Sequence, residues 1–334
     1  MTGVPQLTPA RRDVVNTQVA ETDFMQQADP YRRELLAHCY RMLGSVHDAE
    51  DLVQETYLRA WKAYDNFEGR SSLRTWLHRI ATTACLTALD TKKRRPLPTG
   101  LGAPASDAGG DLIEQGEVAW LEPISDDMID PAEIVEARHT VRLAFIAALQ
   151  HLPPRQRAVL VLRDVLKWKA AEVAEALELS TAAVNSILQR AHAQLKAVAL
   201  SQDDIVEPDS AETRELLDRY VRAFEEKDPK LLASLFTQDA IWEMPPFSGW
   251  FQGPAAIVTL AEEKCPAKHP GELRLIPAAA NGQPTLATYL RHADGVFRPF
   301  QLHVLHIQGT VISHVVAFLD EKLFETFGLP AELT

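Results

Sequence analysis

A fourteen-residue stretch, DAEDLVQETYLRAW (residues 48–61), carries two faces of different chemistry. Its apolar residues recur every three or four positions, which predicts a helix with one side packed against a core. Two carboxylates, one amide and one leucine recur with the same spacing on a second face: Asp51, Gln54, Glu55 and Leu58. Carboxylates held on a helix form charge-assisted hydrogen bonds with the arginines of a partner. This second face is therefore either a docking surface or an ordinary solvated surface.

A second set of side chains has the chemistry needed to read DNA bases. The stretch LPPRQRAVLVLRDVLKWKAAEVAEALELSTAAVNSILQRAHAQL predicts a helix to about Asp164, a short helix over 169–177 and a third helix capped by Ser180 or Thr181. The third helix has an apolar inner face and an outer face of amide, hydroxyl and basic side chains: Thr181, Asn185, Ser186, Gln189 and Arg190. Amides pair well with adenine and Arg with guanine, so this face favours a helix-turn-helix over a helical hairpin of the same apolar spacing.

Length and composition restrict the classes of protein to consider. A chain of 334 residues, 46% of them hydrophobic, is expected to form two or three domains. No apolar run approaches the roughly 20 residues that span a bilayer, and the N-terminal residues lack the apolar centre of a signal peptide. The three cysteines are scattered and lack metal-ligand spacing. We therefore expect a cytoplasmic protein with no membrane association, no metal site, no cofactor and no disulfide framework.

The net charge of −12 is distributed unevenly along the chain. Residues 1–95 have a net charge of +2, and residues 96–137 carry ten acidic side chains and no basic ones. Residues 138–200 have a net charge of +5, and residues 201–334 have a net charge of −9. A DNA phosphate meets local rather than total charge, so the two mildly basic blocks remain compatible with DNA binding.

The order of the segments predicts a multidomain protein: two all-α domains followed by an α+β domain. The boundaries are a flexible N-terminus (1–24), a helical bundle (25–95), an acidic Gly- and Pro-rich linker (96–130), a helix-turn-helix domain (131–200) and an α+β domain (205–330). In the bundle, one helix is expected to run from Leu73 to the cations at 92–95 and to stop at Pro96. In the α+β domain, helices are expected over 211–228, 229–236 and 253–264, and four strand-like runs cover 271–280, 283–292, 298–309 and 310–318. These runs predict a curved antiparallel sheet wrapped against helices.

Taken in this order, the segments resemble a known family. DAEDLVQETYLRAW followed by FEGRSSLRTWLHRIATTACLTAL resembles region 2 of an extracytoplasmic-function (ECF) sigma factor, and the helix-turn-helix stretch resembles region 4. The tail, DAIWEMPPFSGWFQGPAAI onward, is similar to the NTF2-like (SnoaL-like) domains fused to the sigma-G-like and sigma-J-like actinobacterial groups, the first being nearer. The resemblance implies a non-enzymatic factor that binds core RNA polymerase and directs promoter recognition and opening. It also implies a cone-shaped C-terminal domain that modulates this activity.

The resemblance assigns roles to the residues singled out above. In the family, the helix over 48–61 docks on the clamp helices of the polymerase β′ subunit, and the β flap is a further expected contact of the factor. The implied clamp contacts are Asp51, Gln54, Glu55 and Leu58. Region 2 also melts the −10 element and holds an extruded base, which needs cations, a small pocket and an aromatic surface. The matching residues are Arg70, Ser71, Ser72, Arg74, Trp76, Arg79 and Thr83.

Several of these assignments keep alternatives. Trp76 fits a core position as well as a base platform, and Thr83 stands where family members usually have Asn. Promoter phosphates would be gripped, whatever the base sequence, by Lys92, Lys93, Arg94 and Arg95. The −35 element would be read by Thr181, Asn185, Ser186, Gln189 and Arg190. The linker resembles a connector that passes near the polymerase active site, and its acidity fits either that basic channel or simple solubility.

The α+β domain offers a less specific pattern. Its candidate pocket residues are Trp242, Glu243, Trp250, Tyr289, His292, His303 and His306. Strand alternation places His303 and His306 on opposite faces, and no carboxylate–His pair stands out at strand spacing. We therefore expect a regulatory domain, with a small ligand or an anti-sigma factor as further partners to consider. The alternatives are a one-component regulator that senses a ligand, and an isomerase or cyclase activity in residues 205–330.

Overall fold

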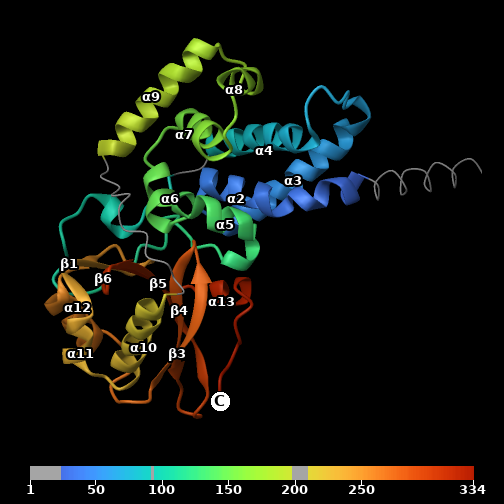
Figure 1. Cartoon of the computed structure of the whole chain (residues 1–334). Coiled ribbons are helices and arrows are strands. Elements are labelled where there is room, and N and C mark those ends of the chain that lie inside the picture. Colours follow the sequence, from blue (N-terminus) through green and yellow to red (C-terminus); the bar gives the residue numbers. More distant parts are fainter. Residues whose placement is uncertain (1–23, 92–93, 198–209) are drawn as a thin grey trace, which may run out of the picture.

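The computed structural model describes residues 24–91, 94–197 and 210–334 (Figure 1). The N-terminus that was expected to be flexible lies outside these residues, except for its last member, Phe24. In the described part of the chain, no helix combines the length and the apolar character needed to cross a bilayer. Figure 1 shows the helices of the N-terminal half stacked against one face of a C-terminal sheet, whose other face is covered by further helices.

The first helical domain is formed by α2 (Arg32–Leu43), α3 (Val46–Ala63) and α4 (Leu73–Leu89). Gly44 ends α2 in the left-handed conformation at φ 70°, which a glycine adopts without steric cost. Ser45 then caps α3 by accepting a hydrogen bond from the backbone N–H of Asp48, and Ser72 caps α4 in the same way. The apolar stripe of α3 is buried, as its periodicity predicts.

The helix that begins at Leu73 is shorter than expected. It ends at Leu89, where the N–H of Asp90 donates to the carbonyl of Leu86, and it does not continue to the cations at 92–95. Asp and Thr at positions 90 and 91 are weak helix formers, and the proline at 96 disfavours helical backbone at the residue before it. Arg94 and Arg95 lie outside the helix, in a stretch without regular secondary structure.

The second helical domain consists of α5 (Pro131–Ala137), α6 (Leu143–Leu149), α7 (Pro154–Leu160), α8 (Ala170–Ala176) and α9 (Thr181–Ala197). A π-helical turn, Val161–Val165, extends α7. Ser180 caps α9 by accepting a hydrogen bond from the N–H of Ala183. The helix-turn-helix has its own small core, which includes Val159, Trp168, Val173 and Val184.

The C-terminal domain is built on a six-stranded sheet of order β2-β1-β6-β5-β4-β3. The strands are β1 (Phe236–Glu243), β2 (Trp250–Gln252), β3 (Leu273–Ala280), β4 (Gln283–Arg291), β5 (Phe297–Gln308) and β6 (Val311–Phe318). The four expected C-terminal strands are confirmed as β3 to β6. The sheet is mixed rather than antiparallel throughout, because β1 pairs with β6 in parallel. Its helices are α10 (Ala211–Glu225), α11 (Pro229–Ser234), α12 (Pro254–Glu263) and α13 (Lys322–Thr326).

The segment over 96–130, which we name the connecting segment, does not span the gap between domains as a free tether. Its first part runs along β1, β2 and the turn between them: the N–H of Ser106 donates to Trp250 O at 2.7 Å, and the N–H of Gln115 donates to Pro246 O at 3.0 Å. Its second part bonds to the first helical domain, where the N–H of Glu122 donates to Gly44 O at 3.0 Å. Four buried apolar residues anchor the segment: Leu97, Leu121, Ile124 and Ile129. They are hard to recognise in a sequence that is otherwise acidic and rich in Gly and Pro.

One apolar cluster joins all these parts. It includes Tyr40 of α2, Leu121 of the connecting segment, Leu149 of α6, and Ala287 and Val304 of the sheet. The other face of the sheet packs in a separate cluster with α10 and α12, together with Ala108 of the connecting segment. Because buried apolar surface is shared between domains, their relative placement is held by packing as well as by polar contacts.

Candidate functional site

The polar face of α3 is separated from its core face as the sequence predicts. Asp51, Gln54 and Leu58 are exposed, and Leu58 keeps 55% of its surface in solvent. Glu55 is half-buried and pairs with Arg59 one turn later at 2.7 Å. The face is therefore accessible to a partner, although a single exposed leucine is also ordinary on a solvated surface.

The residues assigned to the −10 element lie on the loop before α4 and on its exposed side. Arg70, Ser71 and Arg79 are exposed, and Thr83 donates its hydroxyl to Arg79 O at 2.9 Å. Three of the cations are paired within the chain, each with one carboxylate: Arg70 with Glu68, Arg74 with Glu34 and Arg79 with Glu175. The last pair links α4 to α8 of the helix-turn-helix, with 3.7 Å between nitrogen and oxygen.

Trp76 is packed on one side and exposed on the other, which is compatible with both roles that the sequence left open. Its ring lies 4.8 Å from that of Phe67, centroid to centroid, and 6.4 Å from that of Tyr64. The indole is only half-buried, so part of the ring remains at the surface. Core packing fixes the orientation of the ring and leaves a face on which a base can stack.

Arg94 and Arg95 depart from the expectation of a run of free cations. Arg95, with 16% of its side chain exposed, pairs with Asp48 at 2.8 Å and with Glu122 at 3.3 Å. Arg94 donates to Gly100 O at 3.0 Å and its side chain also meets His151. Lys92 and Lys93 lie outside the described residues. In this arrangement the charge of Arg95 is compensated by two carboxylates instead of facing solvent.

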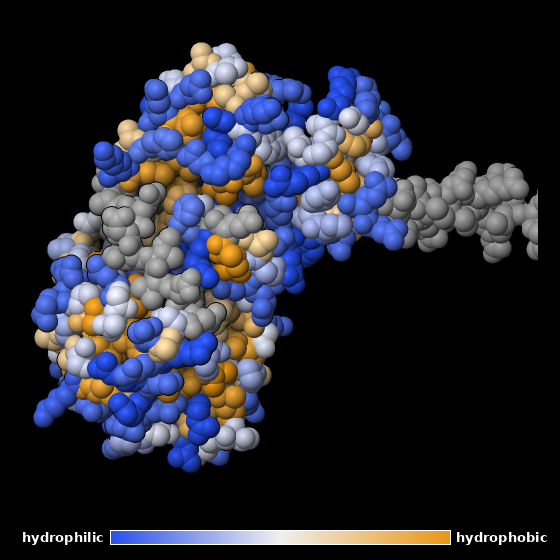
Figure 2. Space-filling model, in the orientation of Figure 1, coloured by the Kyte–Doolittle hydropathy of each residue, from blue (hydrophilic) through white to orange (hydrophobic). Residues whose placement is uncertain are grey.

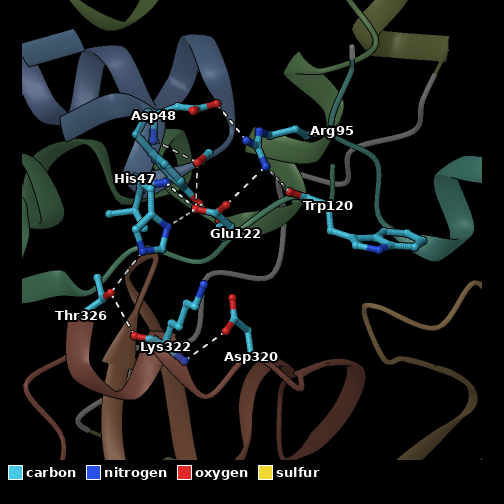
Figure 3. Close-up of polar contacts among 11 residues, drawn as sticks. His47, Asp48, Arg95, Trp120, Glu122, Asp320, Lys322 and Thr326 are labelled. Carbon is cyan, nitrogen blue, oxygen red and sulfur yellow. Dashed lines mark hydrogen bonds and ion pairs between the residues drawn. The ribbon is translucent and has the colours of Figure 1, made fainter. Parts of the chain in front are cut away.

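Glu122 is the centre of this polar network, which Figure 3 shows. Its Oε2 accepts hydrogen bonds from Ser45 Oγ at 2.8 Å and from the N–H of Val46 at 3.0 Å, and it lies 3.0 Å from Nδ1 of His47. The other ring nitrogen of His47 meets Thr326 of α13 at 3.5 Å. The carboxylate of Glu122 therefore ties the connecting segment to the start of α3, and His47 extends the link to the C-terminal domain. Our reasoning from the sequence did not single out this residue, although an acid within the apolar run WLEPI was the available signal.

Asn281 makes a second junction, at the tip of the β3–β4 hairpin. Asn281 and Gly282 both have positive φ, 57° and 64°, as a two-residue hairpin turn of type I′ requires. The fully buried Asn281 amide donates to Tyr40 Oη at 2.9 Å and to Val141 O at 2.8 Å, and it accepts from the N–H of Ile124 at 3.1 Å. One side chain thus contacts both helical domains and the connecting segment.

Asp126 lies beside this turn and gives the junction a pH dependence. It accepts a hydrogen bond from the N–H of Gly282 at 2.8 Å, and burial raises its pKa from 3.8 to about 6. A carboxyl group whose pKa is higher in the folded state favours folding least when it is ionised. The loss of folding stability that comes from ionising Asp126 is therefore small near pH 4. It grows as the pH rises through 6 and is complete above about pH 7.

We expect Asp126→Asn to raise the free energy of unfolding at pH 8 by about 1–3 kcal/mol, since the amide keeps the acceptor oxygen and has no charge to desolvate. The gain should shrink as the pH falls toward 4. Urea unfolding of both proteins between pH 5 and pH 8 measures this difference, and Asp127→Asn at the exposed neighbouring position is the matched control. A gain that does not vary with pH would contradict the assignment.

A cavity of about 140 Å³ lies between the sheet, α10 and α12. Trp242 and His303 line it, as expected, but Glu243, Tyr289 and His292 do not. Glu243 follows Trp242 in the strand and so faces the opposite side of the sheet, while Tyr289 is buried against Phe324 of α13. His292 is exposed in the β4–β5 connection. Two other candidates also lie elsewhere: Trp250 donates to Ala103 O, and His306 lines a small void on the far face.

His303 is held in a neutral, fully bonded state. Complete burial lowers its pKa to about 3. The hydroxyl of Tyr220 lies 3.0 Å from its Nδ1, and Oε1 of Gln301 lies 2.8 Å from its Nε2. Since the amide oxygen can only accept, Nε2 carries the proton and Tyr220 donates to Nδ1. A histidine in this state orients its neighbours and has no free nitrogen for proton transfer.

The structure contains a carboxylate–His pair that our reasoning from the sequence missed. Glu243, which is fully buried, lies 2.7 Å from Nε2 of His314 in the neighbouring strand β6. The same carboxylate accepts from the N–H of Thr99 at 2.7 Å, so the pair lies beneath the connecting segment and helps to hold it. Within the described residues, His, Cys, Asp and Glu side chains form no group of three or more that could hold a metal ion.

The recognition face of α9 is formed as the helix-turn-helix pattern predicts. Thr181, Asn185, Ser186, Gln189 and Arg190 are all exposed. Val184 and Ala191 on the opposite side are buried in the domain. Figure 2 shows hydrophilic side chains interspersed with apolar ones over the two helical domains on the face in view.

Comparisons with known proteins agree with this arrangement of domains. Three family models match: Sigma-70 region 2 at residues 28–95, Sigma-70 region 4 at residues 142–195, and the SnoaL-like domain at residues 208–279. The ECF RNA polymerase sigma factor SigG of Mycobacterium tuberculosis is 62% identical over 315 residues, which cover 93% of this chain and 85% of the relative. SigJ of the same organism is 32% identical over 64% of this chain and 62% of its own length.

The fold as a whole also has a known counterpart. The crystal structure of the M. tuberculosis sigma factor SigJ has a TM-score of 0.62 and is 23% identical, covering 92% of this chain and all of that one. This likeness shows the fold, and the sequence relationship to SigG shows the family. The chain belongs to the extracytoplasmic-function (ECF) sigma factors, which direct RNA polymerase to promoters, and it is a sigma factor rather than an enzyme.

Proposed function

We propose that the connecting segment and the SnoaL-like domain modulate this sigma factor by holding its two DNA-reading domains in a closed arrangement. The observation that supports this most directly is the network around Glu122: this carboxylate of the connecting segment bonds to the start of α3 and to Arg95, and His47 beside it meets Thr326 of α13. Free protein would then be restrained, and binding to polymerase would draw the connecting segment away from the SnoaL-like domain.

Contacts between the two helical domains support the same arrangement. Buried Arg157 of α7 donates to Met42 O of α2 in the first helical domain. The His78 ring of α4 packs edge-on against Trp168 at 6.5 Å. The Arg79–Glu175 pair joins a residue assigned to the −10 element to the first helix of the helix-turn-helix. A factor that reads two separated promoter elements must move these domains apart, so each contact favours the closed state over the promoter-bound one.

On this proposal, polymerase and promoter are bound by separate faces. Asp51, Gln54, Glu55 and Leu58 contact the β′ clamp helices, and the loop before α4 together with Trp76 contacts the melted −10 element. The exposed side of α9 reads the −35 element, and the β flap binds region 4. The faces on α3 and α9 are exposed in the closed arrangement, so polymerase can bind before the domains separate.

We expect Arg190→Ala to weaken binding to a duplex that carries the −35 element by about 1–3 kcal/mol and to affect random DNA much less, because Arg reads the edge of a guanine. The matched control is Lys196→Ala, which removes the same charge from the end of the same helix. The Lys196→Ala variant should weaken binding to both duplexes equally or leave it unchanged. Fluorescence anisotropy with both duplexes at several salt concentrations measures this. Equal losses on both duplexes for Arg190→Ala would remove the base-reading role.

A further inference from the structure

We propose that His78 makes the contact between the two helical domains sensitive to pH: its neutral ring packs against Trp168 in the closed arrangement and takes up a proton when the domains separate, so that mild acid favours separation. The inference rests on the proposed closed arrangement and adds a condition that releases it. Whether the closed arrangement exists at neutral pH and whether acid opens it are separate results of one experiment, so the two failures can be told apart.

His78 lies at the joint between the two helical domains. Its side chain is buried, with 1% of its surface exposed. On the side of the first domain, the ring of His38 on α2 lies 5.4 Å from it, centroid to centroid. On the side of the second domain, the ring of Trp168 lies 6.5 Å from it at an interplanar angle of 65°. The second domain therefore supplies part of the burial of His78, and that part is lost if the domains separate.

The hydrogen bonds fix which nitrogen of each ring carries the proton. Nδ1 of His78 lies 2.9 Å from Arg74 O, and a carbonyl can only accept, so this nitrogen is protonated. Thr82 donates its hydroxyl to His78 O at 2.7 Å and therefore accepts from Nε2 of His38 at 2.9 Å. Within the described residues, the remaining nitrogens, Nε2 of His78 and Nδ1 of His38, have no hydrogen-bond partner. Both rings are therefore neutral in the closed arrangement.

Nε2 of His78 faces a carboxylate that a further proton would turn into a partner. Oε1 of Glu34 lies 3.5 Å from this nitrogen, so two acceptors face each other while the ring is neutral. Proton uptake by Nε2 would convert the contact into an ion pair. The same carboxylate accepts from Nε of Arg74 at 2.8 Å, so the arginine and the imidazolium would share it. Glu34 and Arg74 belong to the first domain and stay with His78 when the domains separate.

The groups around His78 divide into those that oppose and those that favour a proton. Burial is the main cause that lowers the pKa of His78 below 6.5, and the Glu34 carboxylate and the hydrogen bond to Arg74 O raise it. The guanidinium groups of Arg74 and Arg41 lower it further. Among the described residues, the charged or titratable side chains that face the ring are Glu34, His38 and Arg41 on α2 and Arg74 on α4. The side chain that faces it from the second domain, Trp168, has no charge.

The sign of the pH effect follows from which of these groups move. Separation of the domains removes the cover of Trp168 and hydrates the ring, which weakens the main cause of the lowered pKa. The attraction of Glu34 remains, because α2 and α4 stay packed together in the first domain. His78 therefore binds a proton more tightly in the separated arrangement, and acid shifts the equilibrium toward it. A tenfold difference in proton affinity changes the ratio of the two arrangements by up to about tenfold.

Single-molecule energy transfer in the full-length protein measures the arrangement directly. Lys62→Cys on α3 and Ala193→Cys on α9 place dyes at exposed positions of the two helical domains. Cys265→Ser removes the partly exposed native thiol, whereas Cys39 and Cys85 are buried and stay in place. The dyes are chosen for emission that does not change between pH 7.5 and pH 6.0, and far-UV circular dichroism confirms that the helices persist over this range.

The labelled protein should show high transfer at pH 7.5, and the ratio of separated to closed molecules should rise at least about threefold on going to pH 6.0. His78→Asn keeps a donor toward Arg74 O but cannot take up a proton, and His78→Phe keeps a ring against Trp168. Both variants should abolish the rise. Glu34→Gln, which leaves His78 in place and removes the charge that attracts the proton, should reduce it.

The matched control is His292→Asn, which removes an exposed histidine of the C-terminal domain and should respond to acid as the unchanged protein does. Asp126 titrates in the same range, but its protonation favours docking of the connecting segment. The effect of His78 is therefore read as the difference between its variants and the unchanged protein at each pH.

Four outcomes would overturn the inference. Low transfer already at pH 7.5 would remove the proposed closed arrangement, and this inference with it. High transfer at both pH values would leave the closed arrangement standing and remove its release by acid. A rise that persists in both His78→Asn and His78→Phe would assign the response to another group. Transfer that increases at pH 6.0 would show that Trp168 holds the protonated ring more tightly than the neutral one.

Discussion

The double variant Gln54→Ala/Glu55→Ala should lose binding to core RNA polymerase and keep its fold. Both side chains belong to the outer face of α3, while the residues that hold the helix in its domain lie on the other face: Ala49, Val53, Tyr57 and Ala60. Removing one member of a charge pair at an interface typically costs 2–5 kcal/mol or more, so we expect the affinity to fall by a factor of about 100 or more. Competition with labelled wild-type protein for core enzyme measures this loss.

The fold of this variant should be nearly unaffected. Among the residues that the structure describes, the polar contact that it breaks is the solvent-accessible Glu55–Arg59 pair, which is worth a few tenths of a kcal/mol. Glu68→Ala, which also removes an exposed acid from the same domain, is the matched control and should bind core enzyme normally. If the double variant competes as well as wild type, α3 does not dock on the clamp through this face.

Most helices and strands of this protein can be predicted from its sequence because periodicity is a local property. The inner face of α3 and the four C-terminal strands follow from spacing alone, and Ser45, Ser72 and Ser180 mark where helices begin. The end of α4 was misjudged because four cations look like a helix C-terminus, whereas Asp90 and Thr91 had already ended the helix. Family resemblance supplied the assignment of faces to polymerase and DNA, which spacing alone left open.

Contacts between distant segments could not be predicted from spacing. Glu243 and His314 are 71 residues apart and meet only because β1 inserts beside β6 in parallel. The connecting segment was predicted to be a linker because it is acidic and rich in Gly and Pro, but a few apolar anchors decide its position. The orientation of Glu243 could have been predicted from the sequence, because strand alternation alone puts its side chain on the face opposite Trp242.

The Arg95–Glu122 contact bears on how the closed state is released. Arg95 is conformationally held by Asp48 and Glu122, and its guanidinium also donates to Trp120 O at 2.9 Å. As long as these contacts persist, a cation expected to grip promoter phosphates is compensated inside the molecule. Undocking of the connecting segment would remove Glu122 and Trp120 together and leave Arg95 with one carboxylate. Exposure of a DNA-binding charge would then be coupled to movement of the connecting segment.

Glu122→Ala should therefore loosen the connecting segment and raise the activity of the factor. The carboxylate has 21% of its surface exposed and accepts hydrogen bonds from Ser45, Val46 and Arg95. Loss of such an acceptor costs about 1–3 kcal/mol, which corresponds to hydrogen exchange about 10–100 times faster for amides of the segment that open locally, such as those of Leu121 and Glu122. Run-off transcription should increase from the same promoters, and the salt dependence of DNA binding should steepen by about one phosphate contact as Arg95 becomes available.

Glu117→Ala is the matched control for this prediction, because Glu117 is an exposed acid of the same segment with the same charge. It should change neither exchange nor transcription, which separates the effect of position 122 from a change in net charge. Glu122→Gln keeps the shape and one acceptor oxygen, so it should fall between wild type and the alanine variant. Removing the whole SnoaL-like domain is a poorer test, because it would expose the apolar cluster that joins the sheet to α2 and α6. If Glu122→Ala leaves both segment exchange and transcription unchanged, the network around Glu122 does not restrain the factor, and modulation by the C-terminal domain must depend on a different contact.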